Sequence, residues 1–307
     1  MKVYRHIHEL IGNTPLVKIN GFQLPEDVCI FAKLEYMNPG GSVKDRLGLE
    51  LMNDAIINGA IKEGGTMIEP TAGNTGIGLA LAALNRGIKV ILVVPEKFSV
   101  EKQAIMKALG AQIVLTPTSA GMVGAIQKAK ELQKEIRGSY IPSQFSNPAN
   151  PATYYKTLGP EVWDALNGKI DVFVAGAGTG GTFMGSAMFL KEKCPSIKTV
   201  IVEPQGSILN GGEPGPHKTE GIGMEFLPEY MDRRFFNEIY TITDEIAFRY
   251  VKELAEKEGL LVGSSSGAAF AASIEEAKKA KAGSNIVVVF PDGSERYLSK
   301  KIYDGGM

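Results

Sequence analysis

Cysteine, histidine and tryptophan are scarce in this chain of 307 residues, which has two cysteines, three histidines and one tryptophan. Two cysteines, Cys29 and Cys194, are too few for a disulfide framework in a chain of this length. A reducing compartment fits best, and we predict a cytoplasmic protein. The histidines and cysteines form no ligand pattern of the kind that holds zinc, so we predict no metal site.

Long apolar runs and a surplus of charge are also missing. The longest apolar stretches, such as Ile77–Leu84 and Val90–Val94, fall well short of the roughly 18 residues that span a bilayer. The first twelve residues lack the continuous apolar core of a signal peptide. Lys and Arg number 33 against 34 Asp and Glu, whereas neutralising the phosphates of a nucleic acid requires a basic surface. We predict neither a membrane nor a nucleic acid as a partner.

What the chain does have is glycine, at 36 residues, and a regular alternation of patterns. Short β-branched runs alternate with segments that carry apolar residues at helical spacing, and the runs are apolar on both faces. Such an alternation predicts an α/β fold with parallel-rich, twisted sheets covered by helices. The predicted strands are 30–34, 66–69, 89–94, 112–115, 171–175, 199–202 and 285–290. The predicted helices are 45–58, 76–85, 100–109, 121–136, 182–193, 244–257 and 266–280.

The length suggests about two domains. The segment Gln144–Pro151 (QFSNPANP) contains two Asn-Pro steps, which disfavour helix on both sides. We therefore predict a boundary near residue 145, between an N-terminal α/β domain, 1–145, and a C-terminal α/β domain, 146–307. The N-terminal segment is able to cross over and pack on the second domain.

One glycine-rich turn follows a predicted strand and opens a predicted helix. Strand 171–175 runs into Gly176–Gly181 (GAGTGG), and a helix follows from Thr182. A turn at the carboxyl end of a parallel strand aims successive main-chain N–H groups and the positive end of the next helix at one point, which suits a phosphate. Thr179 and Thr182 can add hydroxyl donors. A tight turn without a ligand is the alternative, but it requires fewer glycines.

The same turn satisfies G-x-G-x-x-G at Gly176, Gly178 and Gly181, and the next predicted strand leads to Glu203, near where a ribose-binding acid stands in a dinucleotide fold. Taken alone, the motif favours NAD. An NAD-dependent oxidoreductase, which would be colourless and retain NAD, therefore stays open as an alternative.

Two further turns of small residues join an apolar run to a helix. Thr71–Gly76 (TAGNTG) offers Asn74 and two threonine hydroxyls beside its main-chain N–H groups. A carboxylate is the natural guest, and helix capping alone is the alternative. Gly263–Ala268 (GSSSGA) is the third turn. Three turns of one kind predict a ligand with several polar groups.

One lysine stands at a predicted helix start. In Asn38–Arg46 (NPGGSVKDR), Ser42 would cap the helix with Asp45 three residues later, which places Lys44 in the first turn. The helix dipole opposes a cation there, and burial would lower the pKa of the amine further. A neutral amine can form a Schiff base, whereas an exposed lysine without such a role is the alternative. Together with a phosphate turn, an asparagine and serines for a ring nitrogen, this lysine suits pyridoxal phosphate.

These segments together resemble the fold-type II pyridoxal phosphate enzymes of the cysteine synthase and cystathionine β-synthase family. The resemblance runs over nearly the whole chain, through IGNTPL, NPGGSVKDR, TAGNTG, QFSNPANP, GAGTGGT, EGIG and PDGSERYLS, in that order. It implies a tryptophan synthase β-like fold, pyridoxal 5′-phosphate as cofactor and a homodimer. It outweighs the NAD interpretation of the glycine motif.

The resemblance also implies roles for individual residues. Lys44 would be the Schiff-base lysine and general base, and Asn74 would bond the phenolic oxygen of the cofactor. Ser265 would meet the pyridine nitrogen, with Ser264 as the other candidate among adjacent serines. The phosphate would be bound by Gly178, Thr179, Gly180, Gly181 and Thr182, and the substrate carboxylate by Thr71, Ala72, Gly73, Thr75 and Gln144.

The reaction implied is β-replacement on a small amino acid through an aminoacrylate. Cysteine synthases usually have serine where this chain has Ala72, and the stretch Glu220–Gly223 looks more like the cystathionine β-synthases. The pattern is most similar to short bacterial enzymes that make cystathionine from O-acetylserine, or serine, and homocysteine. The alternatives are O-acetylserine sulfhydrylase, which uses sulfide, and a non-catalytic amino-acid sensor on the same scaffold. Docking of a serine acetyltransferase stays undecided.

Overall fold

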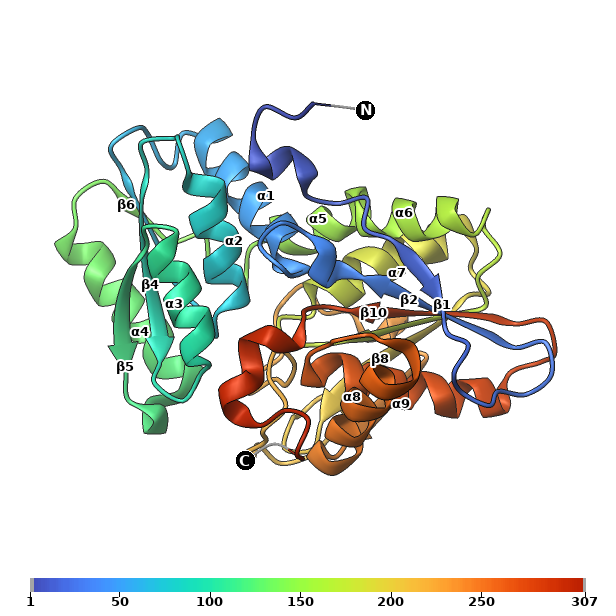
Figure 1. Ribbon diagram of the computed structural model, residues 1–307. Coiled ribbons are helices and arrows are strands. Elements are labelled where there is room, and N and C mark those ends of the chain that lie inside the picture. The colour runs from blue at the N-terminus through green and yellow to red at the C-terminus, as the bar shows by residue number, and fades with distance from the viewer. Residues whose placement is uncertain (1–2, 306–307) are drawn as a thin grey trace. The chain divides into compact units, whose positions relative to one another are not determined.

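The computed structural model describes residues 3–305 and contains two compact units, each built around its own sheet (Figure 1). The first unit comprises Met1–Ile11 and Asn38–Asn150, and the second comprises Gly12–Met37 and Pro151–Met307. Both sheets are parallel except for one strand pair of the second unit. The predicted α/β class with two domains is confirmed.

The first unit holds a four-stranded parallel sheet in the order β5-β4-β3-β6. On the central strand β4, Val90, Leu92 and Val94 pack against helices α2 and α3, and the alternate residues Ile91 and Val93 pack against α4. Helices therefore cover both faces, as a parallel sheet requires. The elements are η1 (Ile7–Leu10), α1 (Lys44–Ile57), β3 (Thr66–Pro70), α2 (Asn74–Ala83), β4 (Lys89–Pro95), α3 (Val100–Ala108), β5 (Gln112–Thr116), η3 (Thr118–Ala120), α4 (Gly121–Glu135) and β6 (Ser139–Tyr140).

Helices α1 and α2 touch through their backbones at two glycines. A Cβ placed on Gly48 of α1 would lie 2.2 Å from the carbonyl carbon of Gly78, and a Cβ on Gly78 of α2 would lie 2.4 Å from the carbonyl oxygen of Lys44. Only glycine permits such an approach. The first turn of α1, which carries Lys44, is thereby fixed against the first half of α2.

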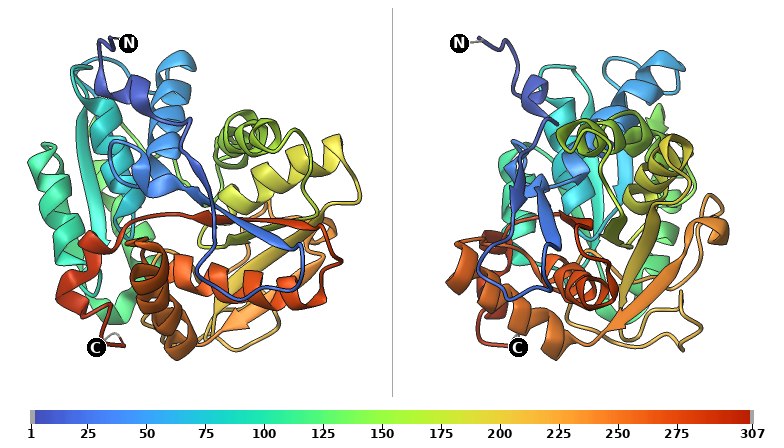
Figure 2. Two further views of the ribbon diagram at one scale, coloured as in Figure 1. Left: turned by 45° about the vertical axis from the view of Figure 1, so that its right-hand side comes forward. Right: turned by 90° about the vertical axis from the view of Figure 1, so that its right-hand side faces the viewer.

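The second unit holds a six-stranded sheet in the order β1-β2-β10-β7-β8-β9, in which β1 is antiparallel to β2. Helices α6 and α7 lie on one side of this sheet and α8 and α9 on the other (Figure 1), and α8 and α9 pack side by side (Figure 2). The elements are β1 (Leu16–Lys18), β2 (Cys29–Leu34), η2 (Glu35–Met37), α6 (Leu158–Ala165), β7 (Val172–Gly176), α7 (Gly181–Lys193), β8 (Lys198–Pro204), η4 (Arg233–Phe235), β9 (Glu238–Ile242), α8 (Asp244–Glu258), α9 (Ser264–Lys279), β10 (Asn285–Phe290) and η5 (Ser294–Lys300).

Each sheet has one point where the strand order reverses. In the first unit the chain runs from β3 to β4 and β5 and then returns to β6 on the other side of β3. In the second it runs from β7 to β8 and β9 and then returns to β10 on the other side of β7. Ligands of open α/β sheets bind outside the carboxyl ends of the strands at such a reversal. The carboxyl ends of β3 and β6, and of β7 and β10, are therefore the places to look for a site.

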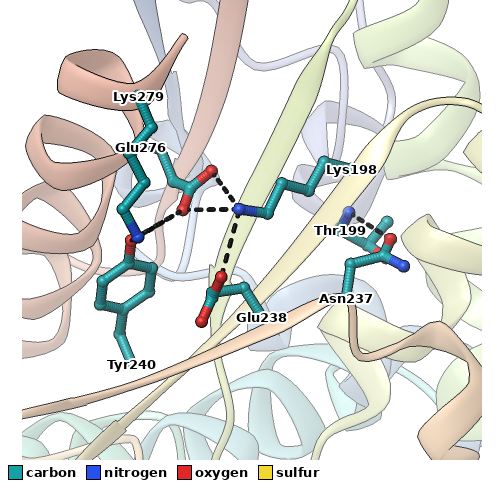
Figure 3. Close-up of polar contacts among 7 residues, drawn as sticks. All are labelled: Lys198, Thr199, Asn237, Glu238, Tyr240, Glu276 and Lys279. Carbon is teal, nitrogen blue, oxygen red and sulfur yellow. Dashed lines mark hydrogen bonds and ion pairs between the residues drawn. The ribbon is translucent and has the colours of Figure 1, made fainter.

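The opposite, amino-terminal edge of the second sheet is held by a polar network (Figure 3). Nζ of Lys198, at the start of β8, lies 2.8 Å from the nearly buried carboxylate of Glu276 on α9. The hydroxyl of Tyr240 on β9 donates to the same carboxylate at 2.7 Å, and burial, followed by Glu276, raises the pKa of that hydroxyl well above its usual value. The network connects α9 to β8 and β9. Its residues are not among those at the carboxyl ends of the strands, where a ligand would bind.

The predicted helices and strands are all present, and the structure adds elements that the patterns missed. Strand β9 and helix α6 were not predicted, and helix α5 (Ala149–Lys156) begins inside the segment expected to break helices. Pro151 stands in the first turn of α5, where its missing N–H costs no hydrogen bond. Among residues 3–305, no helix is long and apolar enough to span a membrane, and Cys29 and Cys194 are both free thiols.

Candidate active site

The turn after β3 lies at the reversal point of the first unit. Thr71, which is buried, accepts the N–H of Gly73 on its hydroxyl at 3.0 Å and donates its own N–H to Val93 of β4 at 2.9 Å. Helix α2 then begins at Asn74 with Gly73 as its N-cap, and no side chain caps the first turn. The main-chain N–H groups in the first turn of α2 therefore face the helix N-terminus, where an anion can accept them.

Gln144 reaches the same turn from the segment that follows β6. Its side-chain oxygen accepts the hydroxyl of Thr75 at 2.7 Å, and its side-chain nitrogen donates to the carbonyl of Pro70 at 3.1 Å. Both Gln144 and Thr75 are almost completely buried. The structure thus brings together the predicted carboxylate-binding residues of the first unit, 71–75 and 144, although they are far apart in sequence.

A buried carboxyl group supports this arrangement. Glu69, on β3, is fully buried and accepts the successive N–H groups of Ser143 and Gln144, each at 3.0 Å. Burial raises the pKa of Glu69 to about 8, and the main-chain donors oppose that shift only in part. Glu69 was not among the predicted site residues, although an acid within a short, largely apolar strand signals a buried partner.

Lys44 is the first residue of α1, as predicted, and is half-buried. The helix start differs in detail from the expected capping box. The N-cap is Val43, which makes no side-chain cap, and the hydroxyl of Ser42 accepts the N–H of Lys44 at 3.2 Å. The carboxylate of Asp45 accepts the N–H of Gly40 at 2.5 Å. Asp45 therefore ties the glycine turn to the first turn of the helix.

The glycine turn after β7 lies at the reversal point of the second unit. A Cβ on Gly178 would lie 2.4 Å from the carbonyl oxygen of Gly221, so only glycine fits. Gly180, with φ of 84°, is the N-cap of α7, and no side chain caps the first turn of that helix. Tyr230 donates its hydroxyl to the carbonyl of Thr179 at 2.8 Å. Since the C=O and N–H of one peptide point in opposite directions, this bond fixes the direction of the Gly180 N–H.

The serines predicted to meet a ring nitrogen form the first turn of α9. The hydroxyl of Ser264 accepts the N–H of Glu220 at 3.1 Å, and the hydroxyl of Ser266 is buried without a hydrogen-bond partner among the described residues. Ser265 is 1% exposed, and its hydroxyl lies 3.7 Å from where a Cβ on Gly221 would stand. Both Ser264 and Ser265 thus neighbour the segment Glu220–Gly221, and the assignment of Ser265 to the ring nitrogen stays a prediction.

Glu203, which the NAD interpretation required to bind a ribose, is committed elsewhere. It is fully buried, and its carboxylate accepts the N–H groups of Leu209 and Asn210 at 2.8 and 3.0 Å and the hydroxyl of Thr241 at 3.0 Å. A ribose would have to displace these bonds. Across the described residues 3–305, no group of three or more His, Cys, Asp or Glu is arranged to hold a metal ion.

The residues present fit pyridoxal phosphate. The turn at Gly178–Thr182 combines a helix start that no side chain caps with a glycine backbone free of Cβ atoms, which lets an anion such as a phosphate approach the main-chain N–H groups. The first unit offers a lysine at a helix start and a turn with uncapped N–H groups and buried hydroxyls, as an amino-acid carboxylate requires. Such a donor set can bind an anionic amino acid and move a proton near a lysine amine.

Comparison with known proteins agrees with this donor set. The family described as "Pyridoxal-phosphate dependent enzyme" matches residues 7–292. The chain is 66% identical to the O-acetylserine dependent cystathionine beta-synthase of Bacillus subtilis over the whole of both chains. It is 53% identical to a cysteine synthase of Helicobacter pylori, over 99% of this chain and all of that one.

A solved structure shares the fold along almost the entire length. The crystal structure of the O-acetylserine dependent cystathionine beta-synthase from Helicobacter pylori superimposes with a TM-score of 0.96 at 53% identity, covering 99% of this chain and 100% of that one. The predicted fold-type II architecture and cofactor are confirmed, and the alternative of an NAD-dependent oxidoreductase is rejected. This chain belongs to the pyridoxal-phosphate-dependent enzymes of the cystathionine β-synthase and cysteine synthase type.

Proposed function

We propose that this enzyme replaces the β substituent of O-acetylserine, or of serine, with homocysteine to form cystathionine. The observation that carries the proposal is the 66% identity, over the full length of both chains, to a Bacillus subtilis protein named for that reaction. Ala72 also supports the proposal, because with alanine the turn lacks the hydroxyl that cysteine synthases usually carry at this position.

The cofactor is assigned to two groups of residues. The main-chain N–H groups and hydroxyls of Gly178–Thr182 would bind its phosphate, the hydroxyl of Ser265 would meet its pyridine nitrogen, and Asn74 would donate to its phenolic oxygen. Lys44 would be the lysine that carries it. When bound, pyridoxal phosphate stabilises the negative charge that develops at the substrate Cα. The uncapped start of α7 supports the phosphate assignment.

The remaining residues orient the substrate and move one proton. Thr71, Ala72, Gly73 and Thr75 line the turn that receives the substrate carboxylate, and Gln144 braces it through Thr75. The Lys44 amine would take the proton from Cα as general base. The electron pair left at Cα would expel acetate or hydroxide from Cβ, and the thiolate of the second substrate would add at that carbon. The protonated Lys44 amine would then return the proton to Cα, which completes the product.

O-acetylserine sulfhydrylase activity is the second candidate. The Helicobacter pylori relatives at 53% identity carry both names, cysteine synthase and O-acetylserine dependent cystathionine beta-synthase. Homocysteine and sulfide both attack the same β carbon, so the choice depends on the room and polar groups beside the turn. A homodimer, as the resemblance implies, is part of this proposal and can be checked by sedimentation.

The deciding experiment gives the purified enzyme O-acetylserine with either homocysteine or sulfide and measures initial rates of cystathionine and cysteine formation. We expect the higher kcat/KM with homocysteine. The variant Ala72→Ser restores the missing hydroxyl and is expected to shift the ratio toward sulfide. A wild type that uses sulfide much faster would reverse the assignment, and a protein that binds the cofactor without turnover would favour an amino-acid sensor.

A further inference from the structure

The fully buried Glu69 plays no part in the chemistry proposed above, yet its contacts point into the substrate turn. Its Oε2 accepts the N–H of Ser143 and its Oε1 accepts the N–H of Gln144, each at 3.0 Å. These N–H groups belong to consecutive residues, and Ser143 has φ of 58°. A left-handed serine is strained, so the two bonds hold the chain in a conformation that it would otherwise leave.

The segment held in this way carries Gln144, which is fixed at three more points. Its side-chain oxygen accepts from Thr75 and its side-chain nitrogen donates to the carbonyl of Pro70. Its own carbonyl accepts the side-chain nitrogen of Asn150 at 2.7 Å. Glu69 is thus the main-chain anchor, and Thr75 the side-chain contact, through which Gln144 reaches the first turn of α2.

We propose that Glu69 is a positioning residue for the substrate carboxylate. By accepting two successive N–H groups, it sets the direction in which the Gln144 amide enters the turn Thr71–Thr75. This inference rests on the proposed function, because it requires that turn to bind the carboxylate of the amino-acid substrate. Glu69 itself touches neither substrate nor cofactor and acts through Gln144.

The second unit contains a matched carboxylate. Glu203 also precedes a proline at the end of a parallel strand, is also fully buried, and also accepts two successive N–H groups, those of Leu209 and Asn210. The segment that it anchors carries none of the residues assigned to substrate or cofactor. Glu203 therefore shares the structural role of Glu69 without the proposed positioning role, which makes it the control.

Replacement by glutamine separates the two roles with little change in shape. A carboxyl group offers two oxygens as acceptors, whereas an amide offers one and turns an NH₂ toward the second N–H. Glu69→Gln therefore loses one of the two anchoring bonds and leaves a buried donor unsatisfied. Glu203→Gln loses one of the corresponding main-chain bonds in the second unit, where the carboxylate also accepts the hydroxyl of Thr241.

The test measures both variants as holoenzymes with O-acetylserine as the varied substrate. For Glu69→Gln we expect KM to rise about tenfold while kcat changes less than about threefold, the pattern of lost substrate binding, with the cofactor absorbance retained. For Glu203→Gln we expect KM within about twofold of wild type, although its Tm also falls. Equal falls in Tm with no change of KM in Glu69→Gln would overturn the proposal.

A double variant tests whether Glu69 acts through Gln144. If it does, Glu69→Gln raises KM in the wild-type background but adds little to Gln144→Ala, whereas independent effects would multiply and contradict the proposal. Should Glu69→Gln fail to fold, Glu69→Asp keeps both acceptor oxygens, and its KM is expected to lie between those of wild type and Gln144→Ala. If Glu69→Asp has the KM and the Tm of the wild type, the proposed positioning role of Glu69 is contradicted.

These outcomes are distinct from a failure of the proposed function. If the wild-type enzyme does not process O-acetylserine, the proposed reaction is wrong. If the wild-type enzyme processes it and Glu69→Gln has the same KM, only the positioning role of Glu69 is wrong.

Discussion

The two glycine-containing turns of this enzyme occupy equivalent places and are built differently. Each follows a parallel strand at the reversal point of its sheet and leads into a helix whose first turn has no side-chain cap. The turn at Thr71–Gly76 is held by side chains, through Thr71, Thr75 and Gln144. The turn at Gly176–Gly181 is held by close backbone approach, with Gly178 against the carbonyl of Gly221, and by a single side-chain bond, from the Tyr230 hydroxyl to the carbonyl of Thr179.

The difference matches what each turn is proposed to bind. A cofactor phosphate stays in place through every catalytic cycle, so a turn that is fixed by packing suits it. A substrate carboxylate arrives and leaves, and hydroxyl and amide side chains allow its affinity to be tuned by single bonds. Substitutions in the turn Gly176–Gly181 should therefore weaken cofactor retention, whereas substitutions in the turn Thr71–Gly76 should raise KM for the amino-acid substrate.

Loss of the lysine beside the first turn should have the largest effect. Lys44→Ala removes the group proposed to hold the cofactor and to take the Cα proton, and we expect turnover to fall at least about 1000-fold. Initial rates of product formation measure this. Lys62→Ala, at an exposed lysine of the same unit, is the control and should keep wild-type rates; comparable activity in both variants would remove Lys44 from the chemistry.

The carboxyl group that supports the first turn should make stability depend on pH. Because the pKa of Glu69 is about 8 in the folded protein against about 4.5 ordinarily, the folded state binds the extra proton. The free energy of unfolding therefore falls, by as much as several kcal/mol, as pH rises from about 4.5 to about 8. Denaturant titrations of wild type and Glu69→Gln measure this, and the advantage of wild type should shrink across that window.

One neighbour could complicate that titration. Burial, followed by the charges of Asp54 and Glu69, raises the pKa of Tyr140 from its ordinary value near 10, so Tyr140 titrates above the window. A difference between wild type and Glu69→Gln that stays constant from pH 4.5 to 8 would show that Glu69 is ionised throughout.

A methyl group at the second turn tests the claim that packing fixes it. In Gly178→Ala the Cβ would stand 2.4 Å from the carbonyl oxygen of Gly221, and we expect a loss of about 1–3 kcal/mol in stability together with weaker cofactor retention. Gly215→Ala is the matched control, since its Cβ would meet its nearest neighbour at 3.6 Å. Thermal unfolding and cofactor absorbance after dialysis report both; a Gly178→Ala enzyme that keeps its cofactor would break the comparison.

The smallest effect is expected from removing one hydroxyl of the turn Thr71–Gly76. Thr75→Val removes the donor to Gln144, and we expect KM for O-acetylserine to rise about three- to tenfold with the cofactor retained. Thr116→Val in the same unit removes a buried hydroxyl that has no hydrogen-bond partner among the described residues, so it should be neutral or slightly stabilising. Equal kinetics for the two variants would mean that the Thr75 hydroxyl does not support substrate binding.

How far the sequence predicted this structure depended on how local the signal was. The strand Lys89–Pro95 and the helix Ser264–Lys279 follow from periodicity, and the glycine turns follow from residue type. Strand β9 (EIYTI) alternates too weakly to be recognised, because it lies at the edge of its sheet and only its last residue is buried. The anchoring of Gln144 by Glu69 could not be predicted, because the partners lie 75 residues apart and meet only when β6 pairs with β3.

The most direct test of the account is chemical reduction of the resting holoenzyme with borohydride, followed by proteolysis and mass spectrometry. The reduction makes a lysine–cofactor bond permanent, and peptide masses identify the lysine that carries it. We expect the pyridoxyl group on Lys44 alone. An adduct on a different lysine, or none on a protein that retains its cofactor, would contradict it.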